Sequence, residues 1–146
     1  MPARKENLYL MRDLASPKRT GRLSNEDLQA LKTIANWTRD SVAQPHPDLG
    51  RRGAVCPFVP AALESDTVWF AVEHINHLSE RQAADLMNQY KNLFLELNPR
   101  EVEESEKACT KTILVIFPDL PEDKLGEYID GSEDRVEAEK ESRRPL

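Results

Sequence analysis

The stretch that decides the fold runs from residue 67 to residue 117 and contains TVWFAVE (67–73), SERQAADLMNQYKNLFLEL (79–97) and TILVIF (112–117). The first and last segments are rich in β-branched and aromatic residues, which favours strands. The middle segment opens with Ser79 and Gln82 as a capping box and continues with apolar residues at helical spacing. Strand, long helix and strand predict a β-α-β unit, whose crossover is right-handed if the strands are parallel.

We therefore predict an α/β fold, with α+β as the alternative, in which a small sheet contains this unit and is flanked by helices. Residues 112–117 are predicted to be a buried central strand, because all six are apolar or β-branched. Two strands alone make a poor sheet. Three explanations stay open: an N-terminal strand completes the sheet, a second chain completes it, or part of the domain is missing and the sheet is incomplete.

A second helix is predicted upstream of the unit. Ser24 has the character of an N-cap, apolar residues follow at helical spacing as far as Val42, and Pro45 ends the helix. Trp37, Trp69 and Phe70 are predicted to be core residues, although each could also line an apolar pocket.

The chain divides by composition into three parts. Residues 1–23 are basic and show no sustained pattern, so we predict a mobile arm. Residues 24–130 are predicted to form a single domain. Residues 131–146 are almost wholly polar and are predicted to be a disordered, charged tail.

Composition also bounds the function. The net charge of −6 over 146 residues argues against nucleic-acid binding, which needs a coherent basic face. No apolar run is long enough to cross a bilayer, so no membrane association is expected. Two cysteines, Cys56 and Cys109, do not indicate a disulfide framework, which favours a cytoplasmic protein. A homo-oligomer remains open, since a second chain could complete the sheet.

A long irregular stretch, QPHPDLGRRGAVCPFVP at residues 44–60, lies between the upstream helix and the first strand, and we call it the site loop. Loops of this length are usually functional or disordered, and the apolar residues of this one argue against disorder. Cys56 can supply a thiolate to haem iron or a soft metal, or pack as a small apolar residue. His46 is stiffened by two flanking prolines, which suits a ligand or a general base as well as a structural role.

Two further groups carry chemistry. Arg51 and Arg52 lie between Gly50 and Gly53, where a sharp turn would present guanidinium groups to a carboxylate or phosphate of a substrate, or simply to solvent. His74 and His77 follow the first strand, and together with Cys56 and His46 they would make a mixed metal set, although this spacing is also common in surface turns.

The chain resembles a bacterial family known only as a domain of unknown function. The resemblance covers residues 25–130 and rests on PHPDLGRRGAVCPFVPAAL (45–63) and on the 111–118 strand followed by Asp119-Leu120-Pro121. It implies a tailoring or accessory role in specialised metabolism. The site loop is also distantly similar to small haem-dependent N-oxygenases, which implies haem at Cys56 or His46. The nearer family continues with a further helix, strand and histidine, whereas this chain enters its charged tail at Gly131.

Two hypotheses follow. The leading one is an oxidative tailoring enzyme that depends on haem or another metal, with Cys56 or His46 as iron ligand and Arg51, aided by Arg52, holding a small-molecule substrate. The alternative is a non-catalytic binding or accessory module, or a truncated inactive family member.

Overall fold

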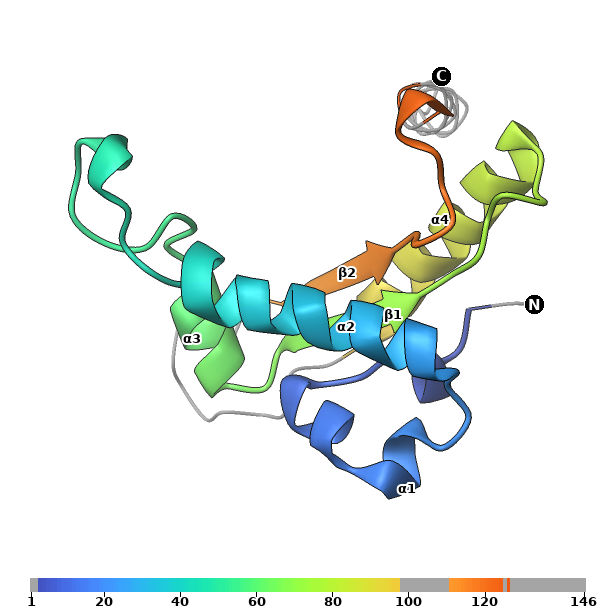
Figure 1. The fold of residues 1–146 in the computed structure, drawn as a ribbon, viewed down its shortest axis with the longest axis horizontal. Coiled ribbons are helices and arrows are strands. Elements are labelled where there is room, and N and C mark those ends of the chain that lie inside the picture. Colours follow the sequence, from blue (N-terminus) through green and yellow to red (C-terminus); the bar gives the residue numbers. More distant parts are fainter. Residues whose placement is uncertain (1–2, 98–110, 125, 127–146) are drawn as a thin grey trace, which may run out of the picture.

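The computed structural model describes residues 3–97, 111–124 and 126 (Figure 1). Its helical elements are η1 (Lys5–Asn7), η2 (Met11–Ala15), α1 (Pro17–Thr20), α2 (Asn25–Trp37), η3 (Thr38–Val42), η4 (Pro47–Leu49), α3 (Val59–Glu64), α4 (Glu80–Glu96) and η6 (Glu122–Lys124). Its strands are β1 (Val68–Val72) and β2 (Thr112–Ile116). No helix in these ranges is long and apolar enough to cross a membrane.

The predicted β-α-β unit is confirmed. β1 and β2 are parallel neighbours in a two-stranded sheet, in register from Val68 opposite Thr112 to Val72 opposite Ile116, and α4 lies between them in the chain. The fold is therefore of the mixed α/β class, as predicted. α2 crosses in front of the sheet in Figure 1, and α4 lies behind it.

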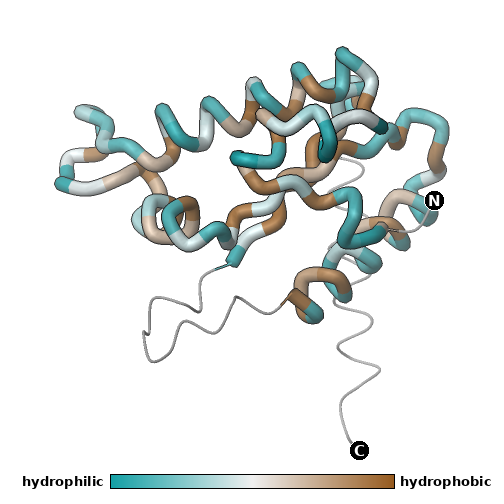
Figure 2. Tube along the Cα trace, turned by 90° about the horizontal axis from the view of Figure 1, so that it is seen from below, coloured by the Kyte–Doolittle hydropathy of each residue, from teal (hydrophilic) through white to brown (hydrophobic). Residues whose placement is uncertain are grey.

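The sheet separates two hydrophobic cores. Val68 and Phe70 point to the core under α2, together with Leu31 and Ala35 of that helix. The alternate residue Ala71 belongs to the other core, which the apolar face of α4 covers with Leu86, Tyr90 and Leu93. Figure 2 shows hydrophobic residues gathered in the middle of the fold and hydrophilic ones along the outer helices and turns. Period-two alternation along β1 thus decides which helix each residue meets.

Both long helices begin as predicted. The Ser24 hydroxyl accepts a hydrogen bond from the backbone N–H of Asp27. Ser79 and Gln82 form the reciprocal capping box of α4. α2 continues into one turn of π-helix, η3, and ends ahead of Pro45.

Trp37 was predicted to be buried and is not. Its side chain is 54% exposed, whereas Phe70 is fully buried and Trp69 is partly buried. The reason is the helix period: Leu31, Ala35 and Thr38 occupy the face of the helical segment that meets the core, so Trp37 lies beyond its edge.

The structure also differs from the predicted mobile arm over residues 1–23. Leu8, Tyr9 and Leu14 are buried, and Tyr9 exchanges two backbone hydrogen bonds with Phe70 of β1, at 2.8 and 2.7 Å. The guanidinium of Arg19 stacks over the Tyr9 ring and donates to the Leu8 carbonyl. Short 3₁₀ turns have no long apolar period, so the sequence pattern does not reveal this docking. An N-terminal strand was one of the three explanations for the small sheet. The N-terminal segment contributes only a single antiparallel bridge, between Tyr9 and Phe70, and not a full strand.

β2 is not the buried central strand that its composition predicts. All five of its residues are only partly buried, and within the described ranges β1 is its one paired neighbour. The physical reason is its place at the edge of a two-stranded sheet. Cys109 and the predicted tail at 131–146 lie outside the described residues.

Candidate functional site

The site loop projects from the body as an arm (Figure 1). Residues 44–53 are all exposed, and η4 forms a turn inside the arm. Two backbone hydrogen bonds close its neck: Val55 N–H donates to the Gln44 carbonyl at 2.9 Å, and Cys56 N–H donates to the Val42 carbonyl at 3.0 Å. The loop is thus folded on itself rather than across the sheet.

Arg51 organises the arm from within. Its guanidinium donates to the carbonyls of Arg52, Ala54 and Val55 at 3.1–3.3 Å. The turn depends on Gly50 and Gly53, whose φ angles of 64° and 95° are in the left-handed region that only glycine adopts without strain. Arg51, which was predicted to hold a substrate, therefore donates its hydrogen bonds to backbone carbonyls of the loop itself.

The predicted site residues are only partly brought together. His46, Arg51 and Arg52 line a shallow pocket with Pro45, Pro47 and Gly50, and the Nδ1 of His46 accepts the Asp48 N–H at 3.2 Å. Cys56 does not line this pocket; it lies at the neck and is partly buried. The roles of these four residues stay predictions.

Removing the Arg51 guanidinium is expected to loosen the arm. Arg51→Ala leaves three carbonyls without their donor, and we expect the local opening free energy to fall by about 1–2 kcal/mol. Amide hydrogen exchange at residues 54–56 measures this. Arg52→Ala is the matched control, because the Arg52 side chain caps nothing in the arm, and equal acceleration in that variant would contradict the assignment.

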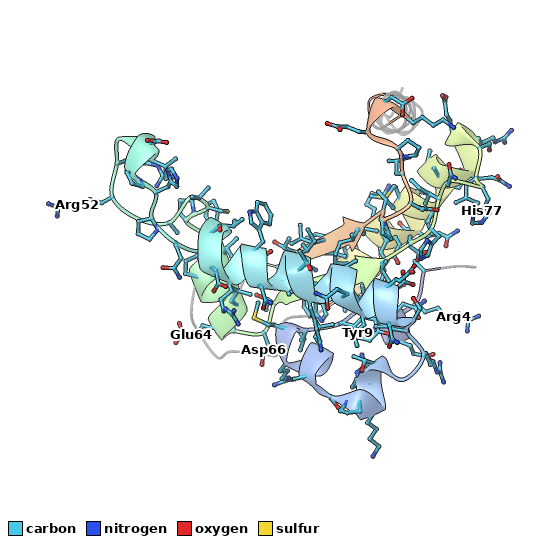
Figure 3. All side chains as sticks on the ribbon, in the orientation of Figure 1. Arg4, Tyr9, Arg52, Glu64, Asp66 and His77 are labelled. Carbon is cyan, nitrogen blue, oxygen red and sulfur yellow. The ribbon has the colours of Figure 1, made fainter. Side chains whose placement is uncertain are left out.

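The predicted mixed metal set does not form. Figure 3 shows Arg52 at the tip of the arm and His77 beside the start of α4, at opposite ends of the molecule. His46 shares the loop pocket with Arg52 and therefore lies far from His77. Within the described residues no group of three histidines, cysteines or carboxylates is placed to hold a metal ion.

A larger cavity, of about 670 Å³, lies at the carboxyl end of β1, and we call it the carboxyl-edge cavity. Its walls come from the N-terminal segment, the start of α2, the residues that follow β1, and one face of α4. They are Asn7, Tyr9, Leu23, Asp27, Val72, Glu73, His74, His77, Leu78, Gln82, Asp85, Leu86 and Gln89. Ligands of α/β proteins commonly bind beyond the carboxyl ends of the strands.

His74 connects three elements at this cavity. Its Nε2 lies 2.8 Å from Oδ1 of Asp27 in α2, and its Nδ1 lies 3.7 Å from Oδ2 of Asp119, which follows β2. Asp119 also accepts the backbone N–H groups of Ile75 and Asn76 at 3.1 and 3.0 Å. Burial by itself raises the pKa of Asp119, but those N–H groups and His74 outweigh it, so the pKa is lowered.

Glu73 is held by a partner from α4. The Tyr90 hydroxyl donates to Oε1 of Glu73 at 2.5 Å. Burial, together with this carboxylate, raises the pKa of Tyr90 well above its ordinary value, so the phenol stays protonated and keeps donating. Glu73 therefore receives its hydrogen bond from a neutral phenol rather than from a cation.

The sequence pattern did not identify Asp27, Glu73 or Asp119 as candidate site residues. Two of them could have been found from their positions in the sequence, because Glu73 directly follows β1 and Asp119 comes soon after β2. Parallel strands have their carboxyl ends at the same edge of the sheet, so residues that follow the two strands lie near each other. Asp27 carries no such signal, because it serves as a first-turn helix residue and meets His74 only through packing.

Comparison with known proteins gives the family. A model described as "Domain of unknown function (DUF6875)" matches residues 31–141, which is more than half of the chain and includes the site loop. The chain belongs to the DUF6875 family. Neither the curated proteins nor the solved structures give a match to this DUF6875 chain.

The predicted membership in a family of unknown function is thus confirmed. The comparisons do not show the similarity of the DUF6875 chain to haem-dependent N-oxygenases, which stays a prediction.

Proposed function

We propose that this DUF6875 protein binds a small organic molecule in the carboxyl-edge cavity and acts as a tailoring or accessory protein in specialised metabolism. The observation that carries the proposal is the cavity itself, where polar side chains from four parts of the chain converge at the carboxyl end of β1. Apolar side chains of Leu23, Val72 and Leu86 line it beside the polar ones, which is the usual composition of a small-molecule site.

The rigidity of the cavity supports the proposal. Asp119 ties the segment after β2 to the segment after β1, and Tyr90 fixes the Glu73 carboxylate. A site whose side chains are already held loses less conformational entropy when a ligand binds.

A screen of small organic fragments by protein-observed NMR tests the proposal. We expect fragments to shift the amide signals of residues 72–78 and 82–89, and Gln89→Trp, which fills the cavity from α4, to weaken their binding about tenfold or more. Gln29→Trp is the matched control, because Gln29 is exposed on α2 and does not line the cavity. Shifts confined to residues 44–53 would overturn the proposal in favour of the loop, and no shifts at all would reject both.

The site loop as folded does not fit haem. A haem pocket covers both faces of the ring with apolar groups and places an axial ligand inside. Here the loop pocket is shallow and open to solvent, so it cannot cover both faces of the ring, and it contains His46 but not Cys56. Haem binding therefore requires a rearranged loop.

Titration with haemin tests the haem prediction directly. A Soret shift that Cys56→Ala or His46→Ala abolishes would establish a haem site on the loop and displace the carboxyl-edge cavity as the leading site. An unchanged spectrum, or a shift that both variants retain, would reject it.

A second candidate function is protein binding through the arm, as an accessory module or a homo-oligomer. It is favoured by the exposed apolar side chains on and beside the site loop: Trp37, Leu49, Val55 and Phe58, of which Phe58 is 66% exposed. Clustered exposed apolar residues are common at interaction surfaces.

A further inference from the structure

The outer edge of β2 carries backbone groups that point away from β1. The N–H of Thr112 donates to the Thr67 carbonyl and the carbonyl of Ile116 accepts the Glu73 N–H, both at 2.9 Å, so these two residues of β2 face β1. Consecutive residues of a strand direct their backbone groups to opposite edges, so Ile113 and Val115 face outward. Within the described ranges neither of them has a backbone partner at that edge.

The two edges of the sheet differ. At the outer edge of β1, Phe70 exchanges its N–H and C=O with Tyr9, which confirms the alternation and covers that edge at one position. Exposed edges are usually protected by a charge, a proline or a bulge. The five residues of β2, Thr-Ile-Leu-Val-Ile, include no charge and no proline, and they pair with β1 in continuous register without a bulge. The edge of β2 is therefore open to another strand.

β2 is complementary to a second copy of itself in the antiparallel direction. With a two-fold axis beside Leu114, Ile113 lies opposite the partner's Val115, and this pair exchanges two hydrogen bonds. The symmetric pair exchanges two more, so all the outward groups of Ile113 and Val115 are satisfied. Leu114 then lies opposite the partner's Leu114, and Thr112 opposite the partner's Ile116. Each of these side-chain pairs is apolar or β-branched, which stabilises a sheet.

The rest of the chain favours a second copy over an internal strand. The segments 98–110 and 127–146 are mostly charged or polar in sequence and offer no uncharged β-branched row to match β2. Charge supports the same arrangement. In Figure 1 the arm lies beyond the amino end of β2 and η6 beyond its carboxyl end. An antiparallel pair turns η6 of one copy, with Glu122 and Asp123, toward the arm of the other, with Arg51 and Arg52.

We propose that two copies of this protein associate through the outer edges of β2, antiparallel and with Leu114 at the two-fold axis, to give a continuous four-stranded sheet in the order β1-β2-β2-β1. A sheet of three or more strands is independently stable, whereas two strands alone are marginal. No residue of β2 lines the carboxyl-edge cavity, so this pairing is separate from ligand binding there.

Mass and hydrogen exchange test the pairing in the unmodified protein. In sedimentation velocity over a concentration series, we expect a species of twice the 16.7 kDa of one chain. In samples where that species dominates, the amides of Ile113 and Val115 should exchange as slowly as that of Leu114. A monomer at every concentration, or a dimer in which the amides of Ile113 and Val115 still exchange fast, would overturn the proposal.

A cysteine at the axis tests the register. In a background of Cys56→Ser and Cys109→Ser, Leu114→Cys places two thiols on residues whose Cα atoms lie about 4.5 Å apart, within the disulfide range. We expect a covalent dimer on mild oxidation. Ile116→Cys is the matched control, since it contacts the same core but lies four positions from its symmetry mate, about 13 Å away. No cross-link at Leu114, or equal cross-linking at Ile116, would overturn the register and the proposal.

Removing an outward donor tests the edge itself. Val115→Pro deletes one N–H donor from each copy at an edge position, where proline is tolerated. We expect dimer affinity to fall about tenfold or more with an unchanged circular dichroism spectrum. Phe58→Ala, on the exposed part of the site loop, is the control and should keep the dimer. An unchanged dimer in Val115→Pro, or its loss in Phe58→Ala, would overturn the proposal. If Val115→Pro does not fold, the Leu114→Cys result decides.

Discussion

Replacing Phe70 with alanine is expected to lower the free energy of unfolding by about 3–5 kcal/mol, the usual range for a buried phenylalanine. Phe70 is fully buried in the core between β1 and α2. The same residue carries the backbone bridge to Tyr9, so the cavity left by the side chain lies where the N-terminal segment, the sheet and α2 meet. Urea denaturation followed by circular dichroism measures the change.

Phe58→Ala is the matched control. It deletes the same side chain from a position that is 66% exposed, and we expect a change within about 0.5 kcal/mol. A cost at Phe58 similar to that at Phe70 would contradict the projecting arm, because it would mean that the site loop packs against the body.

The second large effect is expected at Asp119. Its two oxygens accept the N–H groups of Ile75 and Asn76 and thereby join the segments that follow β1 and β2. Asp119→Asn keeps one acceptor and loses the charge, so we expect a loss of about 1.5–3 kcal/mol at pH 7, the range for hydrogen bonds to charged groups.

This loss depends on pH in a defined direction. The pKa of Asp119 is lowered in the folded protein, so the folded state binds fewer protons at this carboxyl than the unfolded state does. Its stabilising contribution is complete above the unfolded value of about 3.9 and is lost as the pH falls through the folded value. The difference between wild type and Asp119→Asn should therefore shrink below about pH 4.

Urea midpoints at pH 7 and pH 3 measure this dependence. Asp48→Asn serves as the control, because the Asp48 side chain is 91% exposed on the arm and should show neither the loss nor its pH dependence. A difference at Asp119 that stays constant across this range would show that the carboxylate charge is not what joins the two segments.

The cavity and the arm give the protein two distinct surfaces. The carboxyl-edge cavity lies where α2, α4 and the strand ends converge, and its polar groups are held by contacts between those elements. The arm is held by its own backbone and by Arg51, and it presents apolar side chains to solvent. The proposed ligand binding at the cavity and the proposed protein binding on the arm are therefore separable by mutation.

The sequence of the site loop predicted its local turns but not the relative positions of its side chains. Its prolines, and glycines at positions 50 and 53, predicted a sharply turned, ordered segment, and the structure has left-handed φ angles at both glycines. The sequence did not show that Cys56 and His46 are apart: the Cys56 N–H bonds the Val42 carbonyl at the neck, while His46 lines the pocket out on the arm. Which way a loop folds depends on contacts between residues that no local pattern relates.

Local chemistry determined the elements of this protein. The serines at positions 24 and 79 start its two long helices, β-branched runs make its strands, and alternation along β1 assigns side chains to two cores. These features depend on residues a few positions apart, so the sequence alone contains them. Tertiary structure decided the docking of the N-terminal segment on Phe70, the edge position of β2, and the meeting of Asp27 and Asp119 at His74. Those depend on packing between segments up to 92 positions apart, from Asp27 to Asp119, and only the folded chain brings them together.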